Sequence, residues 1–187
     1  MRQELYPAIR SRKAGEHCST ILFKHMPRKP ITILAINPGI RYLGIALFEQ
    51  LDLREWAVKY IRGSTSREKL KKAKAVVGVL LDRYEPDILV LKQLHPSRSS
   101  ANLNRLVGAI KQAAKLRRIK LRQYSIKQVK AFYWPKRRTN KKKLADTLAS
   151  RYPALAHDLA RELANKHPYY IRMFEAVALG AICSQQH

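Results

Sequence analysis

The chain has 187 residues, of which 46% are hydrophobic, so it can bury the core of one domain, and general disorder is excluded. Its 38 lysines and arginines against 13 acidic residues give a formal net charge of +25, which excludes an ordinary neutral surface and indicates a polyphosphate partner. No apolar run approaches the ~18 residues of a membrane span, and two cysteines suit a reducing compartment. We therefore predict an intracellular protein without a membrane partner, in the cytoplasm or nucleoid, with an organelle matrix as the alternative.

The first part of the chain predicts an arm followed by three strands. Residues 1–29 are basic, rich in proline and weakly periodic, which predicts an arm that is flexible or orders only on a partner. A folded domain is predicted over residues 30–187. Apolar and β-branched runs predict strands over Ile31–Asn37, Tyr42–Glu49 and Leu53–Ile61. Their short connections favour an antiparallel meander.

The remainder of the domain alternates helices and strands. The predicted elements are a helix from Thr65 or Ser66 to Tyr84, a strand over Asp87–Gln93, a helix over Asn102–Leu116, a strand over Lys120–Tyr124, and helices over Ile126–Tyr133, Lys141–Tyr152 and Tyr170–Cys183. Antiparallel strands followed by strand–helix–strand crossovers imply an α/β fold with a mixed five-stranded sheet. Helices are expected on both faces of that sheet.

A long basic window lies between Asp87 and Asp146, where no acidic residue occurs. Lysine and arginine neutralise phosphates, and aromatic rings stack on unpaired bases, so we predict binding of structured DNA or RNA. The candidate binding residues are Arg98, Arg105, Arg117, Arg118, Lys120, Arg122, Lys127, Lys130, Tyr133, Trp134, Lys136, Arg137, Arg138, Lys141, Lys142 and Lys143. The alternatives are a solvated basic face, a contact with a membrane surface or an acidic protein, and, for the two aromatic residues, simple core packing.

Three short motifs resemble the RuvC-like branch of the ribonuclease H-like superfamily. They are Ile33–Gly39 with Leu43–Ala46, then Leu89–Gln93, and finally Met173–Gly180. In that family the first strand ends in Asp followed by Pro-Gly, the fourth strand ends in Glu, and a late helix supplies one or two further acids. The resemblance spans residues 31–183 and implies a ribonuclease H-like fold, a branched or otherwise structured nucleic-acid substrate and, in many members, a homodimer.

The resemblance also implies a site for two Mg²⁺ ions, roughly 3.5–4 Å apart, that cleave the phosphodiester to a 5′-phosphate and a 3′-hydroxyl. At the family's acidic positions this chain has Asn37, Lys92 and Glu175, with Arg172 at a possible fourth. Asp to Asn and Glu to Lys change the local charge by +1 and +2, and a protonated lysine cannot ligate Mg²⁺. Only Glu175 would remain as a metal ligand if the site were restored. We therefore predict nucleic-acid binding without Mg²⁺ and without cleavage.

Three explanations of these replacements stay open. The chain is a natural pseudo-nuclease, or it is a Mg²⁺-dependent structure-selective endonuclease disabled at Asn37 and Lys92, or Asn37 belongs to a plain Asn-Pro-Gly turn and the correspondence fails. A role as a non-catalytic subunit of a ribonucleoprotein or recombination complex is a further alternative. Sequence alone does not separate DNA from RNA.

Overall fold

The computed structural model describes residues 29–95, 97, 99–135, 140–165 and 169–186. The predicted arm therefore lies outside the described residues except for Lys29, as do four predicted binding residues. Those four are Arg98, Lys136, Arg137 and Arg138. The division into an arm and a domain stays a prediction.

The sheet has five strands in the order β3-β2-β1-β4-β5. The strands are β1 (Thr32–Asn37), β2 (Tyr42–Glu49), β3 (Asp52–Tyr60), β4 (Ile88–Lys92) and β5 (Lys120–Tyr124). The first three pair antiparallel, whereas β4 pairs parallel with both β1 and β5. We call the end where β1, β4 and β5 finish the carboxyl edge, and the opposite end the amino edge. This is the mixed sheet that the sequence predicts.

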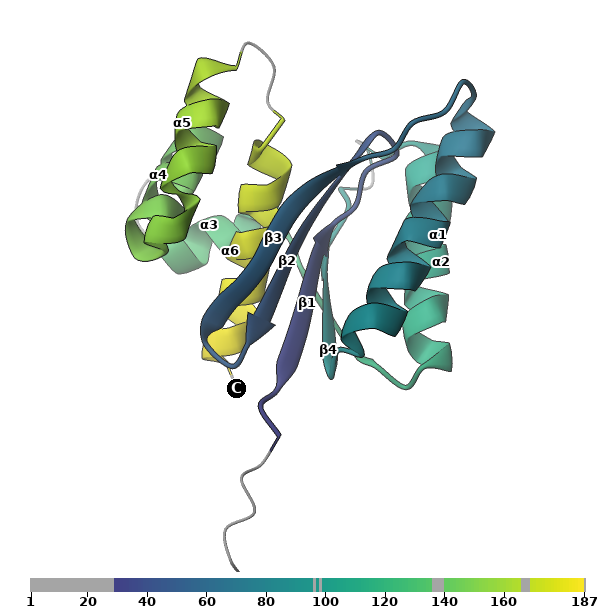
Figure 1. Ribbon diagram of the computed structural model, residues 1–187, viewed down its shortest axis with the longest axis horizontal. Helices are drawn as coiled ribbons and strands as arrows, with labels where there is room; N and C mark the ends of the chain where they lie inside the picture. Colours follow the sequence, from purple (N-terminus) through teal and green to yellow (C-terminus); the bar gives the residue numbers. More distant parts are fainter. Residues whose placement is uncertain (1–28, 96, 98, 136–139, 166–168, 187) are drawn as a thin grey trace, which may run out of the picture.

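Helices cover both faces of the sheet (Figure 1). On one face lie α1 (Ser66–Tyr84) and α2 (Ala101–Leu116). The other face carries α3 (Ile126–Tyr133), α4 (Lys141–Arg151), η2 (Pro153–Leu155), α5 (Ala156–Ala164) and α6 (Ile171–Gln185). Alternation along β1 sends Ile33 and Ala35 to the core on the α6 side, and Leu34 and Ile36 to the core under α1 and α2.

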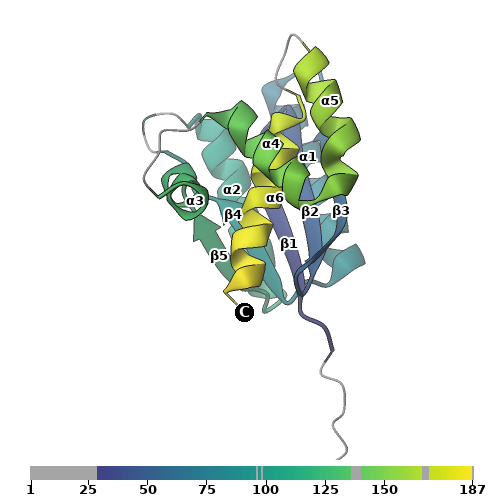
Figure 2. The ribbon, with the colours of Figure 1, turned by 90° about the vertical axis from the view of Figure 1, so that its left-hand side faces the viewer.

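The helix α6 lies directly against the sheet, and α4 packs over it (Figure 2). It is buried from Met173 to Ser184, which explains why its sequence is apolar on all sides. Gly180 permits the close packing, since a Cβ there would lie 2.4 Å from the Phe48 ring. Glu175 is thus the one charged side chain carried into this buried stretch.

Side-chain caps begin the helices where the sequence predicts. Thr65 accepts a hydrogen bond from the backbone of Glu68 at the start of α1, and Ser125 forms a capping box with Gln128 at the start of α3. Predicted and observed boundaries of the predicted strands and helices agree to within two residues, the usual uncertainty at helix and strand ends.

Two helical elements, η2 and α5, are not predicted from the sequence. No element is predicted between Tyr152 and Tyr170, yet η2 and α5 occupy much of this stretch. The helix α5 has no fully buried residue, so its apolar signal is short, and Pro153 precedes it. It is held partly by a long-range hydrogen bond in which Trp56 Nε1 donates to Asp158 Oδ2 at 2.7 Å. In the part of the chain that the structure describes, no helix has the length and apolar character needed to cross a membrane.

Candidate functional site

Three polar side chains from distant segments meet at the carboxyl edge. Asn37 ends β1, Lys92 ends β4, and Glu175 lies in the second turn of α6. The amide Nδ2 of Asn37 donates to Glu175 Oε2 at 2.7 Å, and Lys92 Nζ lies 2.5 Å from the same oxygen. Asn37 and Glu175 are 1% and 3% exposed, so this is a buried polar cluster and not a solvated surface pair.

A second ammonium approaches the other carboxylate oxygen. Lys141, the first residue of α4, places its Nζ 3.3 Å from Glu175 Oε1. The contact is an ion pair without the alignment of a hydrogen bond. Its side chain is 59% exposed, against 22% for Lys92. One carboxylate therefore serves two lysines, one from the sheet and one from the helical layer.

Arg172 lies one turn before Glu175 and turns away from it. Its Nη1 donates to the carbonyl oxygen of Pro38 at 3.4 Å, and its own carbonyl accepts from Asn37 Nδ2 at 3.2 Å. A Cβ on Gly44 would lie 2.1 Å from that carbonyl oxygen, so the first turn of α6 can approach β2 only because residue 44 is glycine.

The charges around Glu175 fix its ionisation. Burial acts to raise the pKa of its carboxyl group, but the ammonium of Lys92, followed by that of Lys141, outweighs burial and holds the pKa below its ordinary value. Glu175 is therefore ionised at neutral pH. With Lys92, Lys141 and Arg172 the four charges of the cluster sum to +2.

The residues of this cluster do not fit a Mg²⁺ pair. Mg²⁺ requires oxygen donors, preferably several that are anionic, and the cluster offers one carboxylate whose two oxygens already face two ammonium groups. Asn37 directs its amide nitrogen, not its oxygen, toward that carboxylate. Within the described ranges, no three His, Cys, Asp or Glu side chains form a group that could hold a metal ion.

Several predicted binding residues surround the carboxyl edge. Lys142 and Lys143 follow Lys141 in the first turn of α4 and are exposed. Arg105 lies in the early part of α2, which begins just beyond the end of β4. The remaining two of this group, Lys127 and Lys130, lie on α3, which begins directly after β5.

Four other predicted binding residues are not brought to this cluster. Arg117 and Arg118 follow the end of α2, and Lys120 begins β5, so all three lie at the amino edge. Arg117 is paired with Asp82 at 2.8 Å. Arg122 lies in the middle of β5, an edge strand. Proximity in sequence grouped them with the others, but α2 returns the chain to the amino edge, where β5 begins.

The two predicted stacking residues lie against the core. Tyr133 and Trp134 are partly buried against the hydrophobic core that includes α6. Burial raises the pKa of Tyr133 well above its ordinary value. Their placement agrees with the core-packing alternative, and a role in binding stays a prediction. The adjacent Phe132, which sequence reasoning did not single out, is 40% exposed.

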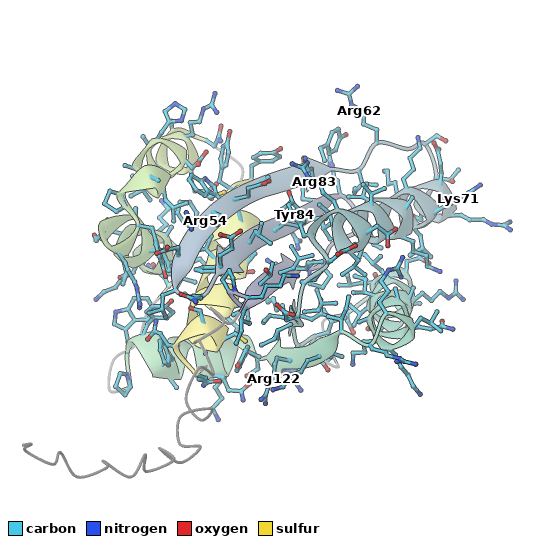
Figure 3. All side chains as sticks on the ribbon, turned by 60° about the horizontal axis from the view of Figure 1, so that its bottom comes forward. Arg54, Arg62, Lys71, Arg83, Tyr84 and Arg122 are labelled. Carbon is cyan, nitrogen blue, oxygen red and sulfur yellow. The ribbon has the colours of Figure 1, made fainter. Side chains whose placement is uncertain are left out.

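Further basic residues at the carboxyl edge were missed because they precede the acid-free window. Figure 3 shows Arg62 and Lys71 extending away from the body of the protein, from the β3–α1 connection and the first half of α1. Arg67, Lys69 and Lys74 belong to the same helical segment. The usable signal was the density of lysine and arginine over residues 59–74, where Glu68 is the only acid.

Comparison with protein families identifies the group to which this chain belongs. The family model of the crossover junction endodeoxyribonuclease RuvC matches residues 33–153. The chain belongs to the RuvC family. A search of curated protein sequences found no significant match.

Solved structures share the RuvC fold at low sequence identity. Thermus thermophilus RuvC in complex with a Holliday junction substrate is 19% identical, with a TM-score of 0.60 over 81% of this chain and 90% of that one. The yeast mitochondrial Holliday junction resolvase Ydc2 is 10% identical, with a TM-score of 0.56 over 82% and 78%. The fowlpox virus Holliday junction resolvase is 15% identical, with a TM-score of 0.53 over 84% and 100%. These likenesses show the fold alone.

Proposed function

We propose that this protein binds branched DNA, such as a four-way junction, through its carboxyl edge and does not cleave it by metal-dependent hydrolysis. The observation that carries the proposal is the Lys92–Glu175 ion pair, with Asn37 donating to the same carboxylate. These residues stand where the family resemblance expects acids. A cluster with a charge of +2 attracts a phosphate without an intervening cation.

The surroundings of the cluster support a phosphate ligand. Lys141, Lys142 and Lys143 present three successive cations at the start of α4, and only Lys141 approaches Glu175. A unit charge about 5 Å from a phosphate contributes about 3 kcal/mol at an effective dielectric constant near 20. The choice of DNA over RNA follows the family description and the junction-bound neighbour.

Binding in the absence of divalent metal is the direct test. In EDTA, the protein should bind a four-way junction, with log K falling linearly as log salt rises. In Mg²⁺ it should leave the same junction intact. Junction cleavage by the unaltered protein, or an affinity that salt does not change, would refute the proposal.

A second experiment separates a pseudo-nuclease from a recently disabled enzyme. The double variant Asn37→Asp with Lys92→Glu restores two acids beside Glu175. Mg²⁺-dependent cleavage by this variant would show that the scaffold retains the nuclease machinery. Intact four-way junctions, R-loops and RNA duplexes would instead favour a binding role or a non-catalytic subunit.

We further propose that two copies of the chain bind one junction, as the resemblance implies. Sedimentation of the complex at saturating protein measures the stoichiometry directly. One copy per junction would remove this part of the proposal and leave binding itself intact.

A further inference from the structure

A cluster of tyrosines borders the site at the carboxyl edge. Tyr42 begins β2, Tyr60 ends β3, and Tyr169 precedes α6. The rings of Tyr42 and Tyr60 stack with centroids 5.4 Å apart and an interplanar angle of 30°. Tyr169 meets Tyr42 edge-on at 5.1 Å. The cluster joins three segments that are remote in sequence and has no part in the ion pairs of Glu175.

Strand register places the tyrosines on the same face as Asn37. Tyr42 pairs with Tyr60, and Gly44, two residues along β2, pairs with Asn37. Neighbouring strands are about 4.8 Å apart and two residues of a strand span about 6.6 Å, so the Cα atoms of Tyr42 and Asn37 lie roughly 8 Å apart. A nucleic-acid strand held at the Lys92 cluster therefore passes within reach of these rings.

Tyr60 is the outermost ring of the cluster. Its strand, β3, is the edge strand of the sheet, and the residue is 47% exposed although one ring face is stacked on Tyr42. Tyr42 is held between Tyr60 and the edge of Tyr169. The exposed ring is thus fixed in position before any ligand arrives, which lowers the entropic cost of stacking against it.

A cation accompanies the rings. Arg41 places its guanidinium carbon 5.4 Å from the Tyr42 centroid and 6.0 Å from the Tyr60 centroid, and its side chain is exposed. An exposed aromatic ring with an adjacent guanidinium matches the two parts of a nucleotide, the base and the phosphate. Packing alone would not require the exposed ring of Tyr60, or the exposed guanidinium of Arg41 beside it, at this basic edge of the sheet.

We propose that the exposed face of Tyr60 stacks on an unpaired base of the bound DNA while Arg41 neutralises the phosphate of the same nucleotide. This inference rests on the proposed branched-DNA function and adds a preference for substrates with unpaired nucleotides beside the branch point. Stacking accepts every base, so the site would select unpaired strands and not a sequence.

The test compares two junctions that differ only in bases. One carries a short arm of unpaired thymidines, and the other carries abasic residues in that arm, so their phosphate charges are equal. The unaltered protein should bind the thymidine arm about 5- to 150-fold more tightly, the range measured for one base–aromatic stack. Tyr60→Ala should abolish this preference, and Tyr60→Phe should retain it.

A matched control uses the exposed ring of Phe132 on α3. Phe132→Ala should keep the preference for thymidine, because this residue lies outside the cluster. Equal affinity of the unaltered protein for both arms, or a preference that survives Tyr60→Ala in a variant with unchanged thermal midpoint, overturns the stacking site. Salt-dependent junction binding would then leave the proposed function standing, whereas loss of all junction binding would remove both.

Discussion

The two ends of the sheet carry charge in different ways. At the amino edge, acids and bases are interspersed and paired: Arg54 with Glu49, and Arg117 with Asp82. Arg83 and Tyr84 lie on the last turn of α1 (Figure 3), and both contact Glu55 of β3. Such exposed pairs contribute about 0–1 kcal/mol each to stability. Their effect is to reduce the net positive charge at this end.

At the carboxyl edge the positive charges outnumber the acids that face them. Lys92 and Lys141 share the single carboxylate of Glu175, Arg172 donates to the carbonyl oxygen of Pro38 instead, and Glu68 is paired with Lys72. The two edges therefore differ in how much of their positive charge is paired with acids. Uncancelled charge concentrated at one end orients the approach of a polyanion.

The largest effect expected from this difference concerns stability. Lys92→Met removes the closest partner of a buried carboxylate, so the free energy of unfolding should fall by about 3 kcal/mol, the lower end for a broken buried pair because Lys141 remains. The matched variant Arg117→Met breaks an exposed pair and should cost about 1 kcal/mol or less. Urea denaturation measures both. Equal losses would erase the energetic distinction between the two edges.

Charge reversal should separate the edges in binding. Lys142→Glu with Lys143→Glu is expected to weaken junction binding more than tenfold and to reduce the slope of log K against log salt by about 2. Arg117→Glu with Arg118→Glu at the amino edge should change the affinity for the junction less than about threefold, measured over the same series of salt concentrations. A stronger loss from the second pair would move the binding surface to the other end of the protein.

Acid should affect the carboxyl edge through Glu175. Its pKa is lowered in the folded protein, so its ionisation stabilises the fold above the unfolded-state pKa, and that contribution is lost as pH falls through the folded-state pKa. Below about pH 4.5 the unaltered protein should therefore lose stability more steeply than Glu175→Gln. Thermal midpoints of the two proteins at a series of acidic pH values give the difference, and parallel curves would contradict the lowered pKa.

Much of the fold follows from local patterns in the sequence. The apolar strands β1 and β4 and the helix starts at Thr65 and Ser125 are visible as short-range signals. The helix α5 is not, because its stability depends on tertiary contacts such as Trp56 with Asp158. Propensity alone carries little information about a helix that buries no residue completely.

The site was predictable only in part, because some of its residues belong to local sequence motifs and others meet only through tertiary packing. Asn37, Lys92 and Glu175 belong to motifs whose order along the chain resembles a known family, so their convergence could be expected. The contact of Lys141 with Glu175 depends on how α4 packs over α6, and no sequence motif records it. The stacked pair of Tyr42 and Tyr60 depends likewise on the register of β2 against β3.

The shared carboxylate has one more consequence. In the free protein, the carboxylate of Glu175 contacts the same two lysines that an anionic oxygen of a ligand would contact. It therefore offsets the repulsion between Lys92 on the sheet and Lys141 on α4. An incoming phosphodiester would compete with this resident carboxylate for the two lysines, and Lys141, the more exposed of them, is the one that it would contact first. Under the proposed function, binding of DNA at this position would exchange the partner of Lys141, while Lys92 would stay paired with Glu175.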